Sequence, residues 1–227
     1  MKSRDRELAR EAERRRRQRE PFGGFLERWL GALVAEHQCE AVEVLEEAHH
    51  AGGGRIVIAM PPGYGKSTIA IGYDVWRQQI TGGTQRQARA SYAGKLSRQL
   101  NRTAREAAVD VGGVMLDPTA TSDALWRTTS GGFSLATSIG RAAATGFRLD
   151  SLTVDDHLAG RAEAESALVR ERSIDWHRSV GRTRLEPGAS VLIVATRWHP
   201  SDLSAWAIEH GYRYVHVPAL NDADEST

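Results

Sequence analysis

Residues 55–68 read Arg-Ile-Val-Ile-Ala-Met-Pro-Pro-Gly-Tyr-Gly-Lys-Ser-Thr, and this stretch decides the fold. Residues 55–60 form a short run of β-branched and other apolar side chains, which is typical of a strand buried on both faces. Prolines and glycines then break the strand, and the pattern that follows predicts a helix over residues 67–79. A strand, a glycine-containing loop and a helix in this order are the context that a phosphate-binding loop requires.

The loop between this strand and this helix carries the groups that bind phosphate. We expect backbone N–H groups to form an anion cradle, with Lys66 reaching the β- and γ-phosphates of ATP and the Ser67 hydroxyl binding Mg²⁺. The full pattern has a glycine five positions before Gly65, where this chain has Met60. The residues expected to contact the nucleotide are Pro62, Gly63, Tyr64, Gly65, Lys66, Ser67 and Thr68.

A second apolar run, residues 151–155, ends in two carboxylates. A P-loop enzyme needs an acid at the end of a neighbouring strand to hold Mg²⁺, so Asp155 is the predicted metal residue. Asp156 is then predicted to orient and deprotonate the attacking water. Glutamate commonly fills that role, so the shorter aspartate has to approach more closely or act through another water. The alternative is that the two carboxylates only cap the following helix.

The remaining apolar patterns alternate between strand and helix along the chain. Strands are expected at 88–92, 151–155, 190–195 and 212–217, with short strands or a hairpin within 119–140, and helices at 95–108, 162–184 and 201–210, after two amphipathic helices that begin at Phe22 and Ala41. This alternation predicts an α/β fold, a P-loop NTPase with a mostly parallel central sheet and helices on both faces. We expect residues 21–220 to form this domain, between a basic arm over residues 1–20 and a tail over residues 221–227.

The composition is that of an ordinary globular domain, with 41% hydrophobic and 26% charged residues. No apolar stretch is long enough for a membrane span or a signal peptide, so we expect a cytoplasmic protein. The positive charge is concentrated in the arm, where Arg14–Arg17 is an uninterrupted basic block. The arm is expected to be a charged helix or a disordered segment. It is either a solvated tail or part of an interaction helix, or it contacts nucleic acid or a partner. Cys39 is the single cysteine, which excludes an internal disulfide, and we expect a buried thiol.

A third apolar strand, residues 190–195, runs into the sequence Thr-Arg-Trp-His-Pro-Ser-Asp-Leu over residues 196–203. Thr196 is expected beside the γ-phosphate, where it reports hydrolysis to the rest of the molecule. The phosphate loop, the strand that ends in Asp-Asp and this third motif, taken in order, resemble the large terminase subunits of tailed bacteriophages. The resemblance is to their N-terminal packaging ATPase and covers the chain from about Phe22 to Pro218.

The resemblance implies a motor that hydrolyses ATP with Mg²⁺ and moves double-stranded DNA. Lys66 and Ser67 match the nucleotide loop of the family, Asp155 and Asp156 match its acidic strand end, and Thr196 matches its coupling motif. The family also implies a homo-oligomeric ring on the capsid of a phage or prophage in a bacterial host cell. Its partners there are the portal and the small terminase subunit.

The sequence departs from this family at two places. Members often carry a basic residue within the loop where this chain has Gly63 and Tyr64, which removes one phosphate contact. The family also has a C-terminal nuclease domain of ribonuclease-H type. A chain that ends at Thr227 has no room for such a domain, so we expect no nuclease activity.

Two further functions of the family have candidate residues in this sequence. In packaging rings a neighbouring subunit supplies an arginine to the bound nucleotide, and such a residue is worth about 10³–10⁵ in rate. Arg148 is the first candidate and Arg141 the second. Gln38, which follows His37, lies upstream of the loop where such ATPases often recognise the base.

Two alternative functions remain open at this stage. A helicase-like nucleic-acid-dependent ATPase shares the loop and the acidic strand, but should show a DEAD or DEAH box where this chain has Asp-Asp-His. A degenerate prophage remnant would bind nucleotide or DNA without turnover, which the missing nuclease domain, Gly63 in the loop and the short Asp156 carboxylate favour.

Overall fold

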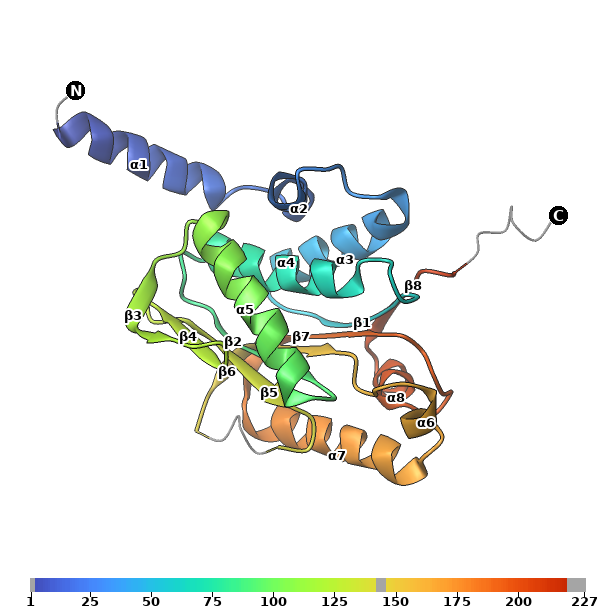
Figure 1. Ribbon diagram of the computed structural model, residues 1–227. Coiled ribbons are helices and arrows are strands. Elements are labelled where there is room, and N and C mark those ends of the chain that lie inside the picture. Colours follow the sequence, from blue (N-terminus) through green and yellow to red (C-terminus); the bar gives the residue numbers. More distant parts are fainter. Residues whose placement is uncertain (1–2, 142–145, 220–227) are drawn as a thin grey trace.

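The computed structural model describes residues 3–141 and 146–219, which form one mixed sheet with helices on both faces (Figure 1). The sheet has eight strands in the order β3-β4-β5-β2-β6-β7-β1-β8. The strands are β1 (Arg55–Ala59), β2 (Arg86–Ser91), β3 (Leu116–Thr121), β4 (Leu125–Thr128), β5 (Phe133–Ser138), β6 (Leu149–Asp155), β7 (Leu185–Ala195) and β8 (Arg213–His216). The helices are α1 (Ser3–Arg17), α2 (Phe22–Leu30), the 3₁₀ turn η1 (Glu36–Gln38), α3 (Cys39–His50), α4 (Lys66–Ile80), α5 (Gly94–Asp110), α6 (Arg161–Ala164), α7 (Ala167–Thr183) and α8 (Leu203–Glu209).

Six adjacent strands, from β5 across to β8, are parallel, and β3 and β4 add an antiparallel edge. The predicted α/β fold with a mostly parallel sheet is therefore confirmed. Parallel strands need helical crossovers, and these cover both faces, which explains why β1 and the end of β7 are continuous apolar runs.

Alternate residues of β1 pack into two separate cores because side chains along a strand point to opposite faces. Ile56 and Ile58 pack with the apolar residues of α2, α3, α4 and α5. Val57 packs on the other face with apolar residues of α7 and α8, including Trp176 and Leu203. The sheet thus lies between two helical layers, which cover its two faces and not the ends of its parallel strands.

Three local predictions were wrong or incomplete. The helix expected over residues 162–184 is divided into α6 and α7, because Ser166 between them is extended, at φ −81° and ψ 109°. The region of residues 119–140 contributes β5, which pairs with β2 as a parallel strand in addition to forming a hairpin with β4. Cys39 is exposed rather than buried, since it begins α3 on the surface.

Helix α1 extends away from the sheet (Figure 1). Its last turn holds the basic block, and these arginines form ion pairs with Glu11 and Glu13 one turn earlier. Arg17 also donates a hydrogen bond from Nη1 to the carbonyl of Val111, at 2.9 Å, which ties the end of the arm to the domain. Within the described residues, no helix combines the length and apolar character needed to cross a membrane. The expected tail over residues 221–227 lies outside the described residues.

Candidate active site

The three predicted motifs meet at one edge of the sheet. Strands β6, β7 and β1 are neighbours and parallel, so the segments that follow them emerge at the same, carboxyl edge. Ser67 Oγ donates a hydrogen bond to Oδ1 of Asp155 at 3.0 Å. Lys66 Nζ lies 3.3 Å from Oδ2 of Asp156. The backbone N–H of Thr196 donates to Oδ1 of Asp156 at 3.2 Å. The structure therefore brings together five of the predicted site residues, namely Lys66, Ser67, Asp155, Asp156 and Thr196.

The phosphate loop has the backbone conformation that its glycines permit. Gly63 and Gly65 lie in the left-handed region, at φ 85° and 84°, where a side chain would be strained. Gly65 immediately precedes α4, so the unpaired N–H groups of that helix begin inside the loop. A Cβ placed on Gly63 would meet no atom within 4 Å, so this side of the loop is open. A helix N-terminus with open space beside it is suited to an anion.

Gln38 and His37 pack against this loop from the η1 turn. Gln38 Nε2 donates to the Tyr64 carbonyl at 2.9 Å, and a Cβ on Gly65 would collide with that nitrogen. His37 Nε2 lies 3.4 Å from the same carbonyl, and its ring meets the Tyr64 ring edge-on at 5.0 Å. The structure thus places Gln38 at the loop. Its recognition of a base stays a prediction.

Asp156 has a strained backbone that directs its side chain into the site. Among the described residues it is the one non-glycine with positive φ, at 49°. Such a conformation costs about 1–3 kcal/mol and persists where the surroundings enforce it. Its N–H donates to the Val194 carbonyl and its carbonyl accepts from the Tyr92 N–H, each at 2.9 Å. The carboxylate contacts Lys66 and Thr196 rather than capping a helix.

Asp155 is almost fully buried, at 1% exposure, and faces the first turn of α4. Burial raises the pKa of its carboxyl group to about 6, against the opposing effect of the nearby Arg89 guanidinium. Its Oδ2 atom has no hydrogen-bond partner. The Asp155 carboxylate and the Ser67 hydroxyl together form a set of hard oxygen donors, which fits the preference of Mg²⁺.

Two charged residues close to this site were not predicted from the sequence. Arg89 in the middle of β2 and Asp74 in α4 are 1% and 2% exposed and form a buried ion pair beneath the loop. A sequence signal existed, because Arg89 lies between two alanines in the strand expected over residues 88–92. Charged residues are almost never fully buried without a partner.

Asp202 joins the loops that follow β6 and β7. Its Oδ1 accepts from the backbone N–H of Ala205 at 2.8 Å and so caps α8. Its Oδ2 lies 3.4 Å from Arg197 Nε and 3.8 Å from His157 Nε2. Burial lowers the pKa of His157, so it is neutral at pH 7. The third motif thus supplies a structural anchor beside Thr196.

Comparisons with known proteins were made for sequence and for structure. No family model matches the chain, and no curated protein matches it. Among solved structures, the HK97 bacteriophage large terminase matches with a TM-score of 0.62 and 14% identity, over 91% of this chain and 45% of that chain. The chain has the fold of the matched part of this phage large terminase.

A second terminase structure also matches, at a lower score. This large terminase, from a thermophilic bacteriophage, gives a TM-score of 0.49 and 12% identity, over 83% of this chain and 48% of that chain. The chain therefore spans about half the length of each of these two terminases.

The two candidate arginines lie at different ends of this terminase fold. Arg148 is exposed and directly precedes β6, so it lies at the amino edge of the sheet, away from the phosphate loop of its own chain. It borders a hollow of about 740 Å³ that Arg55 and Gly188 also line. Arg141 is exposed and follows β5, at the carboxyl edge. Whether either acts on a neighbour's nucleotide stays a prediction.

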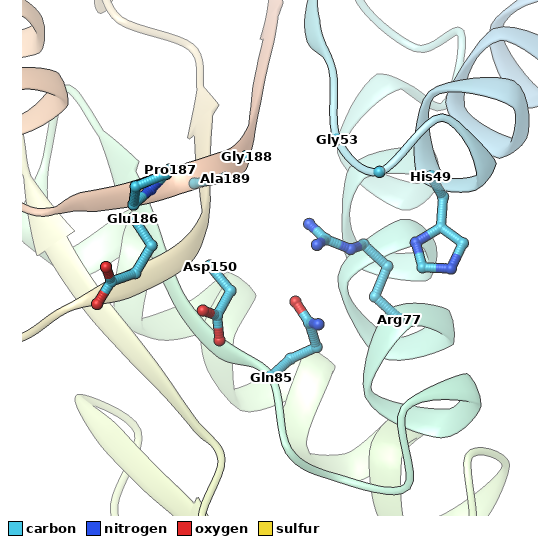
Figure 2. A pocket seen from close by; sticks show the side chains of 10 residues that line it. His49, Gly53, Arg77, Gln85, Asp150, Glu186, Pro187, Gly188 and Ala189 are labelled. Carbon is cyan, nitrogen blue, oxygen red and sulfur yellow. The ribbon is translucent and has the colours of Figure 1, made fainter.

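A smaller cavity of about 260 Å³ lies at the same amino edge. Figure 2 shows the guanidinium of Arg77 on the side that faces Asp150, with Gln85 beside them and His49 on the opposite side of Arg77. Arg77 is 5% exposed, and its Nε and Nη1 atoms have no hydrogen-bond partner. Burial lowers the pKa of His49 to about 4. None of the predicted nucleotide-contacting residues lines this cavity, which is separate from the candidate active site.

Proposed function

We propose that this chain is a Mg²⁺-dependent ATPase that drives double-stranded DNA, the motor part of a phage large terminase. The observation that carries the proposal is the meeting of Lys66, Ser67, Asp155, Asp156 and Thr196 at the carboxyl ends of three adjacent strands. The terminase fold supports it at the level of architecture. Ligands of open α/β sheets bind outside the carboxyl ends of the strands, which is where these residues lie.

In the proposed reaction, the loop and Lys66 hold the phosphates of ATP. Ser67 and Asp155 would hold Mg²⁺, which when bound supplies charge neutralisation at the β- and γ-phosphate oxygens. The ammonium of Lys66 moves from Asp156 to the phosphates, which leaves that carboxylate available to orient the attacking water and accept its proton.

Thr196 is placed to respond to the change at Asp156. Its N–H contacts that carboxylate, and its hydroxyl lies 3.4 Å from the Met60 carbonyl at the start of the loop. A movement of Asp156 therefore reaches the segment between β7 and α8, which Asp202 anchors. We propose this segment as the route from hydrolysis to movement.

The proposed partners are double-stranded DNA, the portal, the small terminase subunit and further copies of this chain in a ring. A packaging motor has to bind DNA of any sequence, so its contacts should be to phosphates. Its affinity for DNA should therefore fall as the salt concentration rises. Arg15, Arg16 and Arg19, together with Arg28, line a hollow of about 690 Å³ at the base of the arm, which is the region that we propose for phosphate contacts.

The test is ATP hydrolysis by the purified chain, measured with Mg²⁺ and with EDTA, with and without double-stranded DNA. We expect Mg²⁺-dependent turnover that Lys66→Ala lowers by at least about 100-fold, since it removes a preorganised charge at the transferred phosphate. Arg102→Ala, which removes an exposed cation in the body of α5 that pairs with Glu106, is the control and should retain turnover.

Other outcomes favour the alternative functions. Nucleotide binding without turnover, with DNA and the packaging partners present, would favour a remnant. Strand separation without translocation would favour a helicase-like enzyme.

A further inference from the structure

A buried ion-pair cluster lies between the helix that follows the phosphate loop and the strand that ends in the acidic pair. Arg89 of β2 forms a hydrogen bond through Nη2 with Oδ2 of Asp74 in α4. The same nitrogen donates to the Ala70 carbonyl at 3.1 Å. Thr153 of β6 donates from Oγ1 to Oδ1 of Asp74 at 2.8 Å. One arginine and one carboxylate thus join β2, α4 and β6.

The other arm of this guanidinium faces Asp155. Arg89 Nη1 lies 3.6 Å from Oδ2 of Asp155, and neither atom has a hydrogen-bond partner. The contact is electrostatic rather than a directed hydrogen bond, because 3.6 Å exceeds hydrogen-bond range. The second oxygen of Asp155 accepts from Ser67, so the carboxylate is held between the arginine and the first turn of α4.

Stability alone does not account for this arrangement. Buried ion pairs are costly to desolvate, and apolar residues of similar volume often replace them with no loss of stability. Here one guanidinium faces two carboxylates, Asp74 in α4 and Asp155 in β6. The planar fork of arginine presents fixed donors to both acids at once, whereas lysine carries one compact ammonium on a flexible stem.

We propose that Arg89, anchored by Asp74, is a positioning residue that sets the Asp155 carboxylate opposite the Ser67 hydroxyl. This inference rests on the proposed function, because the two oxygens would be ligands of the Mg²⁺ that accompanies ATP. Arg89 acts through Asp155 and is not expected to touch nucleotide or metal. Groups that orient a metal ligand in this way typically change metal affinity about 10- to 100-fold when altered.

The chain contains a matched control for this pair. Arg86 lies three residues earlier on β2 and pairs with Asp150 at the start of β6, with Nη2 to Oδ1 at 2.6 Å. The two arginines therefore link the same two strands, Arg86 at the amino edge and Arg89 toward the carboxyl edge. A loss caused by weaker pairing between β2 and β6 should appear in both variants, whereas a loss caused by misplacing Asp155 should appear only at Arg89.

The experiment compares Arg89→Lys with Arg86→Lys in the full chain, after circular dichroism shows that both are folded. One titration follows Mn²⁺ binding to the protein with ADP by electron paramagnetic resonance. A second follows a fluorescent ADP analogue in EDTA, where metal plays no part. We expect Arg89→Lys to weaken Mn²⁺ binding at least about 10-fold. Analogue binding should stay within about twofold, because the loop and Lys66 are intact. Arg86→Lys should change neither.

A second variant covers the case in which Arg89→Lys does not fold. Arg89→Met combined with Asp74→Asn removes both charges of the anchoring pair, and it should show the same selective loss of Mn²⁺ affinity. Either folded variant with Mn²⁺ affinity equal to that of Arg86→Lys would overturn the inference. If the unaltered chain binds neither the ADP analogue nor Mn²⁺, the proposed function fails first and the inference fails with it.

Discussion

The two ends of β6 carry the same kind of ion pair in opposite environments. At the amino edge, Asp150 receives hydrogen bonds from the side chain and the backbone N–H of Arg86, and these lower its pKa although partial burial opposes them. At the carboxyl edge, burial raises the pKa of Asp155 to about 6, and one of its oxygens has no hydrogen bond. A carboxylate whose hydrogen bonds are satisfied, such as Asp150, stabilises the fold. A carboxylate that is left short of partners is suited to take a cation.

The largest expected effect is a difference in ATP turnover between substitutions at the two ends of β6. Asp155→Asn removes the negative charge proposed to hold the metal, so ATP turnover should fall by about 10²–10³. Asp150→Asn, the same change at the other end, should leave turnover within about twofold of the unaltered chain, because no charge at the transferred phosphate is lost. Steady-state hydrolysis at saturating Mg²⁺·ATP measures both. Equal rates for the two variants would contradict the assignment of the carboxyl edge as the active site.

One source of acid sensitivity is expected at the amino edge of the sheet. Burial lowers the pKa of His177 to about 4, and its Nε2 lies 2.9 Å from the Tyr212 hydroxyl, which Arg55 also approaches. Between pH 6.5 and 4 the unfolded chain therefore binds more protons than the folded chain, and stability falls as pH falls. The shift corresponds to about 3 kcal/mol.

The measurement for this histidine is the free energy of unfolding in urea, compared between neutral pH and a pH near the lowered pKa of His177. His177→Gln should reduce the difference between the two values, because glutamine does not titrate. A variant with the same pH dependence as the unaltered chain would show that the acid sensitivity arises elsewhere.

A third expected effect is on the free energy of unfolding. The Asp155 carboxylate that is proposed to hold the metal lowers the stability of the fold. The folded-state pKa of Asp155 lies above its unfolded value of 3.8, so its ionised form destabilises the fold at neutral pH and the penalty disappears as pH falls toward that value. Asp155→Asn should therefore raise the free energy of unfolding at pH 7 by about 2 kcal/mol. Asp150→Asn should lower it by about 1 kcal/mol, because it weakens a satisfied pair. A destabilised Asp155→Asn protein in chemical denaturation would refute this view.

The smallest expected effect is on ADP affinity and comes from Gln38, in the η1 turn. Gln38→Ala removes one hydrogen bond to the phosphate loop, worth about 1 kcal/mol, so ADP affinity should fall about fivefold. Gln85→Ala, in the amino-edge cavity, is the matched change and should leave ADP affinity unaltered. Calorimetric titration measures both. Unchanged affinity in Gln38→Ala would remove Gln38 from the site.

The local motifs could be predicted from the sequence because each is a strand with polar residues directly after it. Parallel strands bring such segments to one edge, which is why Lys66, Asp155 and Thr196 meet as expected. By the same rule, Arg148 lies at the opposite, amino edge, because it precedes a strand rather than following one. The contact of Arg89 with Asp155 required knowledge that β2 lies next to β6, which no local pattern contains. The break at Ser166 likewise lacks a proline or glycine signal.

The strained Asp156 backbone has a consequence for the charge of the loop. Its carboxylate lies 3.3 Å from the Lys66 ammonium, which therefore has a counter-ion within the chain itself. Under the proposed function, phosphate binding would replace one anion at Lys66 by another and would release the Asp156 carboxylate. The positive charge of Lys66 would then be compensated both before and after binding.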